Sequence, residues 1–144
     1  MEVRGLLLKV TSSPGYVAEA RVEDELEVWY DLLECETIDI VNRTIGDKVF
    51  TFVCDDEGIF RQPIPSAISG SETDDSQEII LMGNIFICKD RYDEDLEGVV
   101  LDSLSDDEIL YILTNHIQIL KSRDTEHTFA CVNGVGFQRP VAVV

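Results

Sequence analysis

The chain has 144 residues, 44% of them hydrophobic, which is enough for one folded domain, 1–144, with a core of its own. Its 29 acidic residues outnumber 11 basic ones and give a net charge of −18, so we expect no direct binding to nucleic acid or to an anionic membrane, since both need a basic surface. No apolar run approaches the ~20 residues of a membrane span and no secretory signal is evident, so we expect a soluble cytoplasmic protein.

The N-terminal part of the chain predicts two paired strands and a helix. Residues 4–10 form the first strand, a turn follows at 11–15, and residues 16–22 are expected to pair back with the first strand. Residues 23–33 have helical periodicity, with acids on one face and apolar residues on another. The apolar face is expected in the core and comprises Leu26, Trp29, Leu32 and Leu33.

The stretch 38–58 predicts the β-hairpin around which the fold is built. Gly46 and Asp47 provide a two-residue turn, because a leading glycine takes the positive φ that such hairpin turns need. Residues 49–54 are apolar on both faces of the second strand, apart from Thr51. A strand of this kind is typically central in its sheet and covered on both sides.

The middle of the chain predicts two loops around one strand. Residues 61–78 are rich in proline, serine and acids, which is typical of a surface loop, with one helical turn expected at 66–68. Residues 79–88 are apolar and predict a strand, in which Gly83 marks a bulge or a close backbone approach. Residues 89–98 are expected to form a second acidic loop.

The clearest helix signal begins at Ser105, which forms a capping box with Glu108. The apolar stripe that follows extends the predicted helix over about 105–121, and it comprises Ile109, Ile112, Leu113, His116, Ile117 and Leu120. Asn133 and Gly134 predict another hairpin turn in the C-terminal segment 124–144. Its apolar tail should be covered, either by a strand of the same chain or by a second copy in a homodimer.

Strand and hairpin patterns outnumber helices along the chain. We therefore expect an α+β fold, with a mostly antiparallel sheet on which one long helix, at about 105–121, and one shorter helix, at about 23–33, are packed.

Several short segments carry a family resemblance by their order and spacing: the strand 6–10, the helix ending at Leu33, and the segments 53–58, 83–87 and 104–109. In these the chain resembles a family of small proteins of unknown function carried by phages and conjugative elements, domain-of-unknown-function family 3846. The resemblance covers about 5–120, and the segment after Leu120 is expected to be an addition. It implies a mobile-element setting and an accessory role. Since the family has no established catalytic residues, it implies no site residue.

Patterns typical of catalytic sites are missing from the sequence. His116 falls on the apolar helical stripe, and His127 falls in a polar turn; neither is near a recognisable nucleophile motif. There is no glycine loop for phosphate binding, so we expect no enzyme activity and no cofactor. The cysteines are too widely spaced for the usual zinc or redox motifs and are expected to be buried, reduced thiols: Cys35, Cys54, Cys88 and Cys131.

Residues 93–98 nearly match the start of a calcium-binding loop. Asp93, Asp95 and Glu97 hold the first, third and fifth loop positions, and a glycine holds the sixth. The twelfth position is Leu104, where a bidentate glutamate is required. A solvated acidic loop is the favoured interpretation, and a divalent-metal site at Asp93, Asp95 and Glu97 is the alternative.

The acidic surface itself is the feature most closely tied to function, and we expect it to bind a basic protein partner electrostatically. The candidate contact residues are Glu23, Glu27, Asp31, Glu34, Asp55, Asp56 and Glu57. The first four recur along one predicted helix face at about 6 Å per step, close to two phosphate steps of a DNA strand, which favours DNA mimicry. Solubility alone would explain the same pattern. A nucleotide-like small ligand is an alternative that needs convergence of Arg43, Arg61, Lys89 and Arg91.

Overall fold

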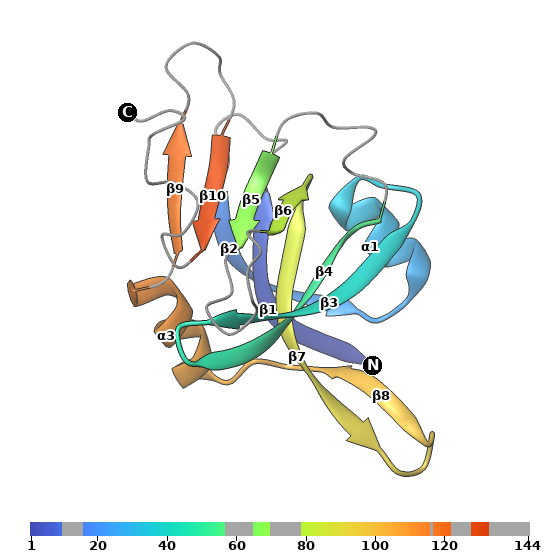
Figure 1. Ribbon diagram of the computed structural model, residues 1–144. Coiled ribbons are helices and arrows are strands. Elements are labelled where there is room, and N and C mark those ends of the chain that lie inside the picture. Colours follow the sequence, from blue (N-terminus) through green and yellow to red (C-terminus); the bar gives the residue numbers. More distant parts are fainter. Residues whose placement is uncertain (10–15, 57–64, 70–78, 116, 122–127, 133–144) are drawn as a thin grey trace.

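The structure, a computed structural model, describes residues 1–9, 16–56, 65–69, 79–115, 117–121 and 128–132 (Figure 1). Within these ranges the chain forms two sheets and two helices. In chain order the elements are β1 (Glu2–Lys9), β2 (Tyr16–Glu23), α1 (Leu26–Leu33), β3 (Ile38–Ile45), β4 (Lys48–Asp55), β5 (Pro65–Ser69), β6 (Ile79–Met82), β7 (Ile85–Asp93), β8 (Gly98–Asp102), α3 (Asp106–Asn115), β9 (Ile117–Lys121) and β10 (Thr128–Val132).

The larger sheet has six strands, in the order β2-β1-β7-β4-β3, with β8 paired to the far part of β7. Every pairing in it is antiparallel. The smaller sheet has the order β6-β5-β10-β9, and its β10–β5 pair is parallel. The expected α+β fold with a mostly antiparallel sheet is therefore confirmed.

The two helices cover opposite faces of the six-stranded sheet. Trp29 and Leu33 of α1 pack in one core cluster with the β7 residue Phe86, and Ile109 and Ile112 of α3 belong to the other cluster. β4 contributes to both, since alternate side chains of a strand point to opposite faces. This explains the nearly unbroken apolar run in its sequence.

The central hairpin forms as predicted. Gly46 has φ 66°, and Ile45 pairs with Lys48 across the two-residue turn. The buried hydroxyl of Thr51 donates a hydrogen bond of 2.9 Å to the Asn42 side chain, so the polar residue in the apolar strand is satisfied. The side chains of β4 are buried only from its third residue onward, since Val49, the second residue, is 64% exposed.

Both predicted helices are longer than the real ones. α3 ends at Asn115, and residues 117–121 form β9, which pairs with β10; the β-branched Ile117 and Ile119 favour this strand. The prediction of one long helix over 105–121 was therefore wrong. α1 begins at Leu26, because Glu23 stays in β2 opposite Glu2. Leu26, expected in the core, is exposed.

The capping box at the start of α3 is confirmed. The Ser105 N–H donates to Glu108 Oε1 at 2.8 Å, and the Glu108 N–H donates to Ser105 Oγ at 3.2 Å. Lys89 Nζ lies 3.0 Å from the same carboxylate. Burial alone would raise the pKa of Glu108, but the hydrogen bonds from Ser105 and Lys89 outweigh it and lower the pKa.

The middle of the chain differs most from the sequence prediction. Residues 65–69 form β5 rather than a loop with a helical turn; Pro65 stands first, where a strand tolerates proline. The strand expected at 79–88 is two strands in two sheets, β6 and β7, separated by Gly83 with φ 84°. A Cβ on Gly83 would meet its nearest atom only at 3.8 Å, so the glycine serves the turn and not a close approach.

The acidic loop expected at 89–98 is an arm of two strands. β7 runs on to Asp93, the chain turns at 94–97, and β8 pairs back from Gly98. The arm extends away from the body of the domain (Figure 1).

Several predictions lie outside the described residues: the acidic cluster at 72–78, the turn at 133–134 and the apolar tail. In the described ranges no helix has the length and hydropathy to cross a bilayer.

Candidate functional site

One of the two most acidic stretches of the chain surrounds α1; the other, between Arg91 and Lys121, also has eight acidic residues and no lysine or arginine. Between Arg21 and Arg43 there are eight acidic residues and no lysine or arginine. The stretch runs from the end of β2 through α1 into β3, and these two strands lie at opposite ends of the strand order β2-β1-β7-β4-β3. We call it the α1 acidic surface. The absence of lysine and arginine between Arg21 and Arg43 was visible in the sequence, and it indicates this acidic surface more clearly than the regular spacing of the acids on a predicted helix face.

Trp29 fixes α1 to the sheet. Its ring meets the Phe86 ring edge-on, with centroids 5.1 Å apart and planes at 61°, and it is almost fully buried. The indole N–H donates a hydrogen bond of 2.9 Å to Asp24 Oδ1. Because this face of the helix is held in the core, Glu27 and Asp31 on the other side remain exposed.

Glu34 ends the helix in the left-handed conformation, with φ 58°. Its carboxylate lies 2.6 Å from Lys9 Nζ, and the buried side chain of Asn84 donates to it at 3.4 Å and to the Leu33 carbonyl at 3.3 Å. Glu34 is thus a partly neutralised anchor for the helix end, rather than a free carboxylate. Neither Lys9 nor Asn84 was recognisable in this role from the amino-acid sequence.

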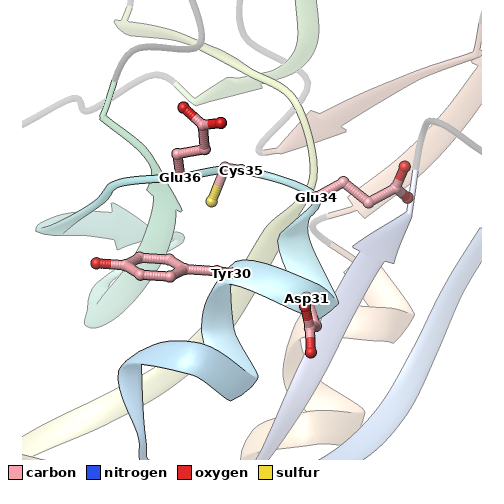
Figure 2. Close-up of a pocket in the computed structure, with 5 residues that line it drawn as sticks. All are labelled: Tyr30, Asp31, Glu34, Cys35 and Glu36. Atoms are coloured by element: carbon pink, nitrogen blue, oxygen red, sulfur yellow. The ribbon is translucent and has the colours of Figure 1, made fainter.

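A shallow pocket of about 360 Å³ lies at the C-terminal end of α1, lined by Tyr30, Asp31, Glu34, Cys35 and Glu36. Figure 2 shows its three carboxylates pointing in different directions, away from one another. Carboxylates that diverge cannot chelate one ion, but the exposed Asp31 can meet a cation on a partner.

The chain after β4 adjoins this pocket. The Asp56 N–H donates to the Thr37 carbonyl at 3.2 Å, and Ile38 pairs with Asp55. Asp56 is exposed, which is consistent with a surface role. Asp55, predicted on the contact surface, is instead 9% exposed, and Glu57 lies outside the described residues.

The four-acid ladder predicted on one helix face does not exist. Glu23 belongs to β2, where it lies 3.0 Å from the amino group of Met1, and Glu34 follows the last helical residue. Only Glu27 and Asp31 keep the helical step. The match to DNA phosphate spacing was therefore wrong, because it depended on a helix starting at residue 23.

The residues of the possible calcium site lie at the end of the arm. Asp93 Oδ1 accepts the backbone N–H groups of Asp95 and Leu96 at 2.9 and 3.1 Å, and Arg91 lies 3.3 Å from its other oxygen. These donors, the Leu96 amide first, hold the pKa of Asp93 below its usual range. Among the described side chains no three His, Cys, Asp or Glu are grouped to hold a metal ion, and Glu97 is placed on the turn with φ 50°.

The cations needed for a nucleotide-like ligand lie on two strands where the structure describes them, Lys89 and Arg91 on β7 and Arg43 on β3. Lys89 pairs with Glu108 and Arg91 with Asp93, while Arg61 lies outside the described residues. Among the residues that the structure describes, no lysine or arginine lines the pocket in Figure 2.

The described cysteines have the properties of core residues. Cys35, Cys54 and Cys88 are buried and free of disulfides, as predicted, while the side chain of Cys131 lies outside the description. Burial raises the pKa of the Cys54 and Cys88 thiols to about 12. At that pKa a thiol is a poor nucleophile near neutral pH.

Comparison with known proteins identifies a family without an assigned activity. The sequence model of the family described as "Domain of unknown function (DUF3846)" matches residues 3–114. The chain therefore belongs to this family, and its segment beyond residue 114 lies outside the match. No curated protein and no solved structure matches the chain.

Proposed function

We propose that this DUF3846 protein is a non-enzymatic accessory protein of a phage or other mobile element, and that it binds a basic protein partner through the α1 acidic surface. The mobile-element setting rests on the family resemblance in the sequence. It is tested by the genes around this one: integrase, portal or conjugation genes support it, and a conserved housekeeping operon contradicts it.

The uncancelled charge is the observation that carries the proposal. Arg4, Lys9, Arg21, Lys89 and Arg91 are already paired with carboxylates of the same chain. Even one-to-one pairing of all 11 basic residues would leave 29 − 11 = 18 acids. A basic partner would relieve this repulsion, and its approach would be accelerated by the field of the domain.

A basic groove of a DNA-handling protein is one surface that would fit. With the regular ladder gone, DNA mimicry rests on net charge and the mobile-element setting alone. A nucleotide-like ligand is the weaker alternative, because a phosphate needs converging cations or helix N-terminal amides, and the pocket at the end of α1 is lined by carboxylates.

The proposal is tested by capture with matched variants. Tagged protein is incubated with host lysate and the bound proteins are identified. The Glu27→Gln/Asp31→Asn variant removes two exposed charges from α1, and the Glu94→Gln/Asp95→Asn variant removes two from the turn of the arm. Both lower the net charge equally.

We expect a basic protein that is lost with the α1 variant and retained with the arm variant. Equal loss with both would mean that only total charge matters. Capture that is unaffected by either variant and by salt would contradict the proposal.

A further inference from the structure

A second depression lies on the α1 side of the larger sheet, where the arm meets the body of the domain. It has a volume of about 330 Å³ and is lined by Asp24, Ile40, Asp90, Val99, Val100 and Leu101. These residues come from the link before α1, from β3 and from the arm. We call this depression the arm groove.

Two of the apolar side chains that line the groove face solvent. Val99 is 67% exposed and Ile40 is also exposed, while Leu101 is buried in the α1-side core cluster. Tyr92, the cross-strand partner of Val99, is exposed as well, so the apolar surface continues along the arm. Exposed apolar side chains that are neighbours in space mark interaction surfaces more often than isolated ones do.

Carboxylates stand at the same groove. Asp24 is exposed and Asp90 is half-buried, and the two come from different parts of the chain, Asp24 from the link between β2 and α1 and Asp90 from β7. In the described part of the chain its lining has no lysine or arginine. A depression lined by apolar side chains and two carboxylates is complementary to an apolar side chain flanked by cations.

We propose that the arm groove binds a short segment of the partner in which one aliphatic or aromatic residue is flanked by lysine or arginine. This rests on the proposed function, and it names the chemistry of the partner and the place where it docks. The volume accommodates one or two side chains, and the apolar strip beyond it on the arm suits a polypeptide that continues past the groove.

The test uses a random peptide display library selected on the purified protein at low salt. Three variants are compared after thermal unfolding confirms that they fold. Val99→Ser removes the apolar wall, and Asp90→Asn removes one flanking charge. Leu110→Ser is the matched control, because Leu110 is 63% exposed on α3, which covers the other face of the sheet.

We expect selected peptides to combine an apolar residue with lysine or arginine. Their affinity should fall roughly tenfold with Val99→Ser, as expected for a lost apolar contact of about 1.4 kcal/mol, and should be unchanged with Leu110→Ser. Asp90→Asn should weaken binding at low salt and reduce its salt dependence.

The alternative outcomes separate the two proposals. Basic peptides without an apolar residue, bound equally by the Val99→Ser variant, would overturn the groove assignment and leave the electrostatic function standing. Apolar peptides whose binding ignores salt would also overturn it. If no basic peptide binds at low salt, both proposals fail.

Discussion

Gly5 of β1 should be the least replaceable glycine in the described part of the larger sheet. A Cβ at this position would overlap the Ile87 carbonyl oxygen of β7 and come within 2.7 Å of the Phe86 ring. The oxygen is part of a strand and cannot move without disturbing the sheet. The Phe86 ring packs against Trp29, so a shift of this ring would displace α1, which carries the acidic surface.

The size of the effect follows from this geometry. Adding atoms to a packed core typically costs about 1–3 kcal/mol, and a clash with backbone belongs at the upper end, so Gly5→Ala should cost about 3 kcal/mol. Gly98→Ala is the matched control, since its Cβ would meet its nearest atom, the Leu96 carbonyl oxygen, at 3.8 Å. It should be neutral or stabilise by up to about 1 kcal/mol, through a less flexible unfolded chain.

Thermal and urea unfolding measured by the fluorescence of Trp29, the only tryptophan, provides the assay. For a domain of this size about 3 kcal/mol corresponds to a fall in Tm of roughly 6–12 °C. The native emission of the Gly5→Ala variant should also shift to the red, because α1 is displaced. Equal stability of the two variants would refute the packing of Phe86 and Trp29 described here.

Three further predictions concern α3, the charge and the thiols. Glu108→Ala loses the capping box and the Lys89 ion pair, and should cost about 1 kcal/mol more in chemical unfolding than Asp107→Ala, which removes the same charge from the same turn; equal costs would contradict the observed cap. Added salt should raise Tm, because it screens the repulsion of a chain with net charge −18. Acidification toward about pH 5 should also raise Tm, but below about pH 4.3 stability should fall. In the folded protein the hydrogen bond from Arg4 and the charge of Arg4 lower the pKa of Glu19. A carboxylate with a lowered pKa contributes its full stabilisation of the fold above its ordinary pKa, and it loses that contribution as the pH falls through the lowered pKa. A Tm that is flat with salt would mean that the acids are paired. Cys54 and Cys88 should resist a thiol reagent at about pH 8.5 and react in denaturant; rapid modification of the native protein would contradict their burial.

Features that depend on neighbouring residues were predictable from the sequence. The turn at Gly46, the pairing of the first two strands and the cap at Ser105 follow from local backbone chemistry, and each is found. The end of α3 was not, because Ile117 and Leu120 fit a helical stripe as well as a strand. The pairing of β9 with β10 decides between these possibilities, and periodicity contains no information about it.

The candidate site was predictable in composition but not in arrangement. The acidity of α1 is visible in the sequence, whereas the neutralisation of Glu34 by Lys9 depends on the contact of two distant segments. The burial of Asp55 likewise depends on the folded chain around it. The arm groove combines residues from the link before α1, from β3 and from the arm, and Val99 by itself is an ordinary strand residue. Such sites become visible only once the topology is known.

The salt dependence of the complex with a captured basic partner tests the electrostatic function most directly. Its Kd is measured by calorimetry between about 0.01 M and about 1 M salt, where the Debye length falls from ~30 Å to ~3 Å. We predict that the affinity of the native protein falls steeply over this range, and that the Glu27→Gln/Asp31→Asn variant has both a weaker affinity and a shallower slope. A Kd that stays constant with salt, or a slope that the variant does not change, would contradict binding through the α1 acidic surface.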